Sequence, residues 1–174
     1  WHALCPMYGH MMVSPTHPDA ANPNGRLNLL LSYAGWQETP WVDRLPAMLT
    51  PMGINSHVAN SLSGAQRVIE ANPIHIAVVD LALPLDDAGA ATAEEAGTRI
   101  LNLLARLASP PPTVVIKRRR TARDDAREMN AALRSGAFAV VDRPIAQRDI
   151  ESLLDVLRRC MSRHYKNRWP GASP

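Results

Sequence analysis

Short apolar runs alternate along most of the chain with longer segments in which apolar residues recur every three or four positions. Five of these runs are rich in leucine or β-branched residues and are bounded by glycine, proline and polar turn residues, a pattern that predicts strands. The predicted strands cover residues 26–33, 54–59, 74–80, 113–117 and 137–142.

The segments after the strands have the spacing of helices with one buried face. Ser61 or Ser63 begins the second helix, and a long loop over residues 85–96 precedes the third. Thr121 can cap the fourth helix, and Gly136 follows it in the manner of a C-terminal glycine cap. The predicted helices cover residues 41–49, 61–72, 97–108, 122–134 and 146–166.

Strict alternation of strands and helices predicts βαβ units, whose right-handed crossovers require a parallel sheet with helices on both faces. We therefore expect an α/β fold of the flavodoxin-like doubly wound (βα)5 type, with a five-stranded parallel sheet, over residues 26–162. Residues 1–25 are interpreted as an expression-tag remnant followed by a flexible lead-in, and residues 163–174 as a C-terminal tail.

Asp80 ends the third predicted strand, which is apolar on both faces like a buried parallel strand. In open α/β sheets, ligands and chemistry collect at the carboxyl ends of the strands. Asp80 is therefore the first candidate for a functional group. A carboxylate in this position can also serve only to cap or solvate the end of a strand.

The composition is typical of a globular protein, with 46% hydrophobic and 20% charged residues, and it excludes a disordered chain. The net charge of +3 is too small, without a clustered patch, to indicate nucleic-acid binding. Cys5 and Cys160 have neither disulfide nor metal-ligand spacing, and no apolar run is long enough to cross a bilayer. We expect a cytoplasmic protein with no membrane partner. Nucleophile–base sets and glycine-rich phosphate loops are absent, so we expect no enzyme.

Five short motifs occur along the chain in a fixed order. They are Val78 to Pro84 around Asp80, Gly97 with Ile100 and Leu101, Thr121 to Asp125, Ser135 to Ala137, and Asp142 to Ile145. Their order resembles that of the receiver domain of two-component response regulators. The resemblance implies that Asp80 corresponds to the aspartate that accepts a phosphoryl group. Thr121 then corresponds to the switch residue, and Arg143 with Pro144 to a lysine followed by a cis proline.

The chain departs from receivers at the metal site that this resemblance implies. Receivers end the first strand with two adjacent acidic residues, whereas Ser32 and Tyr33 occupy that place here. Mg²⁺ takes oxygen ligands, and phosphoryl transfer depends on the metal to neutralise charge. We therefore expect no cofactor and slow or absent phosphorylation. Mg²⁺ is expected only if Asp80 and the loop acids Asp86 or Asp87 form a substitute site.

Arg143 is the second departure, because it replaces the lysine of the family. Arginine is a planar fork whereas lysine is a compact point charge, so the two are not interchangeable. Arg143 can either pair permanently with Asp80 or point to solvent.

These features predict an atypical receiver-like signalling domain, a pseudo-receiver that acts as a protein-interaction module. The expected contact surface is formed by the fourth helix, fifth strand and fifth helix. It would bind a signalling protein such as a separate effector, or a second copy of the chain in a homodimer.

Two alternatives remain open. In the first, the chain belongs to a phosphorelay as a phosphoacceptor response regulator, taking a phosphoryl group on Asp80 from a histidine kinase. In the second, it contacts nucleic acid through Arg118, Arg119 and Arg120, which follow Lys117. Nucleic acid is disfavoured because no aromatic residues are interleaved with these cations.

Overall fold

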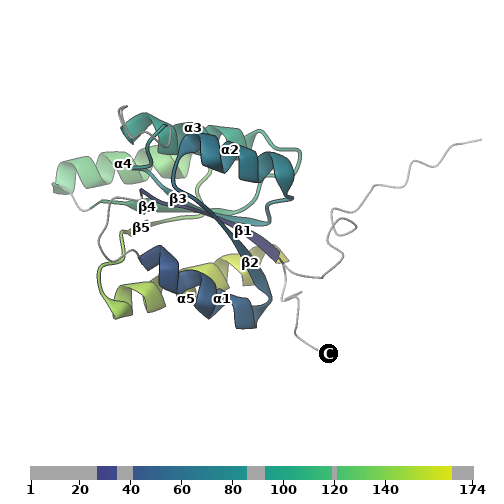
Figure 1. Ribbon diagram of the computed structural model, residues 1–174. Coiled ribbons are helices and arrows are strands. Elements are labelled where there is room, and N and C mark those ends of the chain that lie inside the picture. The colour runs from purple at the N-terminus through teal and green to yellow at the C-terminus, as the bar shows by residue number, and fades with distance from the viewer. Residues whose placement is uncertain (1–26, 35–40, 86–92, 119–120, 166–174) are drawn as a thin grey trace, which may run out of the picture.

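The computed structural model describes residues 27–34, 41–85, 93–118 and 121–165 (Figure 1). Five parallel strands form one sheet in the order β2-β1-β3-β4-β5. The strands are β1 (Leu27–Ser32), β2 (Ile54–Ala59), β3 (Ile76–Asp80), β4 (Thr113–Lys117) and β5 (Ala139–Asp142).

Helices α2, α3 and α4 cover one face of the sheet, and α1 and α5 cover the other (Figure 1). The α-helices are α1 (Arg44–Leu49), α2 (Leu62–Ala71), α3 (Ala93–Ala105), α4 (Ala122–Arg134) and α5 (Gln147–Tyr165). Two short 3-10 helices, η2 (Trp41–Asp43) and η3 (Thr50–Met52), flank α1. The predicted fold class is confirmed. Helix α5 continues beyond the domain boundary expected at residue 162, and residues 1–25 lie outside the described residues.

The central strands are buried on both faces because successive side chains alternate between the two helical layers. Leu29 and Leu31 of β1 pack with Val78 of β3 in the core beneath α1 and α5. Leu30 and Val79 belong to the second core, beneath the other three helices. Burial on both faces explains why these strands appear in the sequence as continuous apolar runs. No helix in the described part of the chain is long and apolar enough to cross a membrane.

The start of the third helix differs from the prediction. Helix α3 begins at Ala93 rather than Gly97, and it ends at Ala105. The residues before Gly97 are mostly alanine and glutamate, whose helix propensity outweighs the glycine as a helix boundary. Glu94 and Glu95, expected in the loop, therefore belong to the helix.

Gly97 has a packing role instead. A Cβ atom at this position would lie 2.6 Å from the Cα of Leu81 and 2.9 Å from its carbonyl oxygen. These are backbone atoms that cannot turn away as a side chain does. The absence of a side chain at Gly97 thus lets α3 lie directly against the segment that follows Asp80.

We predict that Gly97→Ala destabilises the fold by about 1–3 kcal/mol, because the added methyl group forces α3 away from Leu81. Urea unfolding followed by circular dichroism measures the change. Asn102→Ala, an exposed position on the same helix, is the matched control and should be neutral or slightly stabilising. Equal stability of Gly97→Ala and the parent would contradict the close contact.

Cys160 on α5 is fully buried, and burial raises the pKa of its thiol from 9.0 to about 12. In a Cys5→Ser background Cys160 is the sole thiol. We predict that at pH 8 it reacts with iodoacetamide roughly a thousandfold more slowly in the folded protein than in urea, since the thiolate is the reactive form. Because the pKa of the Cys160 thiol is higher in the folded protein than in the unfolded chain, burial of the neutral thiol contributes to the free energy of unfolding below pH 9. This contribution is lost as the pH rises toward 12. Rapid labelling of the folded protein would contradict this burial.

Candidate functional site

Asp80 lies at the carboxyl end of β3, the middle strand of the sheet, and is only 1% exposed. Its neighbours in the sheet are β1 and β4, and its direct partner on β4 is Ile116. Because all strands are parallel, their carboxyl ends meet at this edge. The sheet thus places Asp80 where side chains from several strands and loops converge.

Both carboxylate oxygens of Asp80 have partners inside the protein. The guanidinium Nη2 of Arg143 lies 2.5 Å from Oδ2 and donates a hydrogen bond to it. The backbone N–H of Ala82 donates to Oδ1 at 2.9 Å, and that of Ala34 donates to Oδ2 at 3.5 Å. Arg143 is itself 7% exposed. Of the two arrangements that the sequence allowed for Arg143, the structure has the ion pair with Asp80.

The segment after β5 positions Arg143. Its backbone N–H donates to the carbonyl oxygen of Lys117 at 2.8 Å, which extends the pairing of β4 and β5 by one residue. The next residue, Pro144, is buried, and no cis peptide bond occurs in the described chain. The cis peptide expected at Pro144 is therefore wrong. The bond is trans, the form that X–Pro bonds prefer by about 0.5–1 kcal/mol.

Ser32 and Tyr33 add no negative charge to this edge. Ser32 is fully buried, and its Oγ donates to the carbonyl oxygen of Val78 at 3.1 Å. Tyr33 packs against the core beneath α1 and α5. Desolvation by burial, with the nearby charge of Asp43, raises the pKa of Tyr33, so its hydroxyl stays neutral.

The residues at this edge do not fit a bound Mg²⁺ ion. Ser32 and Tyr33 at the end of β1 offer no carboxylate, and both oxygens of Asp80 accept hydrogen bonds within the protein. Across the described ranges, no three or more His, Cys, Asp or Glu side chains gather as a metal-binding group. The loop acids Asp86 and Asp87, considered as substitute ligands, lie outside those ranges.

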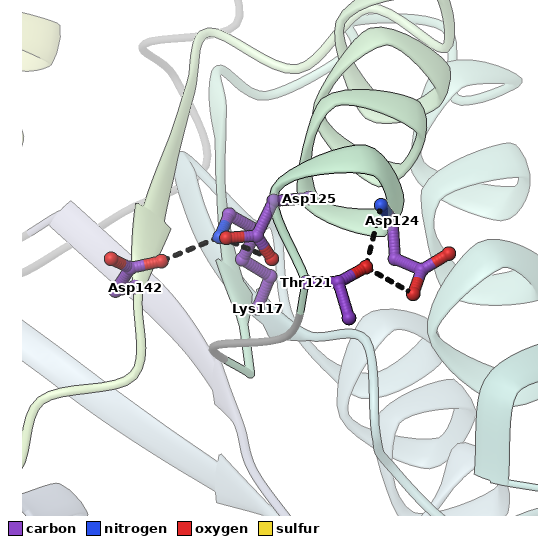
Figure 2. A network of polar contacts seen from close by, with 5 residues as sticks. All are labelled: Lys117, Thr121, Asp124, Asp125 and Asp142. Atoms are coloured by element: carbon purple, nitrogen blue, oxygen red, sulfur yellow. Dashed lines mark hydrogen bonds and ion pairs between the residues drawn. The ribbon is translucent and has the colours of Figure 1, made fainter.

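Lys117 is a polar residue of this edge that the sequence analysis did not single out as a site. It precedes the run Arg118, Arg119 and Arg120 that was considered for nucleic-acid contact, yet it is 7% exposed at the end of β4. Its Nζ lies 2.6 Å from Asp142 Oδ1 and 3.1 Å from Asp125 Oδ1 (Figure 2). Burial lowers the pKa of Lys117, but its hydrogen bonds to Asp142 and Asp125 and their charges outweigh burial, so the pKa is raised. Its position as the last residue of a buried strand was the available signal.

Thr121 stands directly before helix α4. It is exposed and caps α4: its Oγ1 accepts from the backbone N–H of Asp124 at 3.3 Å and donates to the Asp124 carboxylate at 2.7 Å (Figure 2). The structure therefore confirms Thr121 as a helix cap, while its correspondence to the switch residue stays a prediction. Arg118 is half-buried, whereas Arg119 and Arg120 lie outside the described residues.

Comparisons with known proteins find the fold rather than a close relative. No family model matches the chain, and no curated protein matches its sequence. Three of the solved structures that match have TM-scores of 0.55–0.60 and 17% sequence identity to this chain. A response regulator receiver domain protein from Methanospirillum hungatei matches with a TM-score of 0.60 over 81% of this chain and 98% of its own. The receiver domain of a Francisella response regulator matches at 0.59, over 79% and 98% of the two chains.

A third match is a response regulator from Burkholderia pseudomallei with a phosphorylated aspartic acid, at a TM-score of 0.55 over 81% of this chain and 75% of its own. The agreement with these three structures covers most of the described sheet and helices. The chain therefore has the fold of a response regulator receiver domain.

We predict that Arg143→Met lowers the free energy of unfolding by about 3–5 kcal/mol, because it leaves the buried Asp80 carboxylate without its cation. The double variant Asp80→Asn/Arg143→Met should be less destabilised than Arg143→Met alone, since neither charge then remains buried. Urea unfolding of the four proteins of the double-mutant cycle gives the coupling energy. Arg148→Met removes an exposed cation five residues away and should change stability by less than about 0.5 kcal/mol. Additive effects of the Asp80 and Arg143 changes would contradict a coupled pair.

Proposed function

We propose that the chain is an atypical receiver-like signalling domain that acts as a protein-interaction module without conventional Mg²⁺-dependent phosphorylation of Asp80. The receiver fold supports a role in signalling. The ion pair between Asp80 and Arg143 is the observation that supports the atypical part of the proposal.

An acceptor carboxylate must present an oxygen to the incoming phosphorus atom. In this chain, Oδ2 of Asp80 accepts from Arg143 and Ala34, Oδ1 accepts from Ala82, and the residue is 1% exposed. Before Asp80 could attack, Arg143 would have to move away from it. That movement leaves the buried carboxylate without its cation, which has a large free-energy cost. This requirement argues against phosphoryl transfer at an ordinary receiver rate.

The charge balance at this edge supports the same proposal. Phosphoryl transfer needs cations that neutralise the transferring group, and Mg²⁺ usually supplies them. Ser32 and Tyr33 are neutral, so they do not replace the acidic metal ligands of receivers. The guanidinium of Arg143 already compensates the charge of Asp80. The cation and the carboxylate of this ion pair thus neutralise each other without a phosphoryl group.

Output would pass through the surface of α4, β5 and the start of α5, where apolar side chains reach solvent. Ile145, in the segment between β5 and α5, is 81% exposed, and Met129 and Leu133 of α4 are 41% and 45% exposed. Met129 and Leu133 are four residues apart and therefore lie on the same side of α4. Exposed apolar side chains that share one surface are typical of a protein-contact site. The proposed partner is a signalling protein or a second copy of this chain.

The test is intact mass spectrometry after incubation with acetyl phosphate and Mg²⁺. We predict no mass gain in the parent protein, because Arg143 occupies the acceptor carboxylate. A receiver that has the acidic pair, treated in parallel, shows that the reagent is active. A gain of one phosphoryl group in the parent but not in Asp80→Asn would overturn the proposal and support the phosphoacceptor alternative.

A further inference from the structure

Helix α4 has few buried contacts with the rest of the domain. Ala132 is the one buried residue among its thirteen. Helix α5, in contrast, buries six side chains, including Leu153 and Leu157. A helix with so little apolar burial lies at the low end of local stability. Polar contacts are therefore expected to help hold α4 in place.

Lys117 provides that attachment (Figure 2). Its ammonium group binds Asp125, in the first turn of α4, and Asp142, the last residue of β5. Lys117 and Asp142 are also direct partners in the β4–β5 register. A single side chain at the end of β4 thus connects the start of a loosely packed helix to the edge strand.

The environment of Lys117 strengthens these contacts. Its side chain is 9% exposed, whereas Asp125 and Asp142 are 29% and 42% exposed. An ion pair with one buried partner is less screened than a pair on the open surface. Both carboxylates bind the same Nζ, so removal of the ammonium leaves two negative charges facing each other. Their repulsion would push α4 away from β5.

We propose that Lys117 is an electrostatic clamp that holds the start of α4 against the end of β5 and keeps the α4–β5 surface in one arrangement without phosphorylation. The clamp itself stands on the contacts of Lys117. Its significance for docking rests on the proposed function, which assigns output to this surface. The raised pKa of Lys117 supports a clamp that stays charged at neutral pH.

The clamp is adjacent to the Asp80–Arg143 pair. Asp142 binds Lys117 through its side chain, and the next residue, Arg143, binds Asp80. The backbone N–H of Arg143 in turn donates to the carbonyl oxygen of Lys117. A backbone hydrogen bond between the ends of β4 and β5 therefore links the cation of one ion pair to the cation of the other.

The test is hydrogen–deuterium exchange of the whole chain, read by peptide. Lys117→Met keeps most of the buried stem but removes the charge. We expect exchange in the first half of α4 and in β5 to rise roughly tenfold, with β1 and β3 unchanged. The matched control is Thr121→Ala, which removes the cap of α4 without touching β5. It should raise exchange in the first turn of α4 alone.

A second variant separates charge repulsion from loss of fold. Lys117→Met/Asp125→Asn leaves one carboxylate, so exchange in α4 should fall back part of the way toward the parent. Unchanged exchange in Lys117→Met, or an equal rise over all strands, would overturn the clamp. Neither result depends on the phosphorylation experiment. A mass gain on Asp80 there would overturn the proposed function while leaving the clamp to be judged on exchange alone.

Discussion

The ion pair between Asp80 and Arg143 is the constraint on which the carboxyl edge of the sheet depends. Removal of water from a carboxylate and a guanidinium costs several kcal/mol for each ion, and mutual attraction offsets that cost only when the geometry is good. Arg143 meets this condition by reaching from the end of β5 past β4 to a carboxylate on β3. Its backbone is held by Lys117 while its side chain is held by Asp80. Strands that are not direct neighbours are thereby connected at one edge.

The two buried cations at this edge pair with carboxylates of the same chain. Arginine occupies the position facing one buried carboxylate, where its planar donors suit the oxygen. Lysine occupies the position between Asp125 and Asp142, where a compact ammonium can serve both. Neither cation is left to attract a phosphoryl group, and this internal neutralisation is the physical basis of the proposed function. The Burkholderia response regulator, whose fold is similar, contains a phosphorylated aspartic acid. A shared fold does not by itself fix the chemistry of a site.

Local sequence patterns predicted most elements because their signals are local. The bounds of β2, β4 and α4 agree with the structure, since proline, glycine and a threonine cap mark their ends. Helix α3 was placed four residues late because Gly97 was interpreted as a boundary rather than as a close contact with Leu81. The burial of Lys117 was not predicted because the basic run that follows it dominates the local pattern. Both errors concern residues whose role is set by a distant partner.

The sequence by itself determined the alternation of strands and helices, the two-faced burial of β3, and the position of Asp80 at a strand end. These follow from side-chain periodicity and backbone propensity, which act over a few residues. Only the tertiary structure decided that Arg143 binds Asp80 and that Lys117 joins α4 to β5. Asp80 and Arg143 are 63 positions apart. Their pairing depends on strand order and register, which no short stretch of sequence encodes.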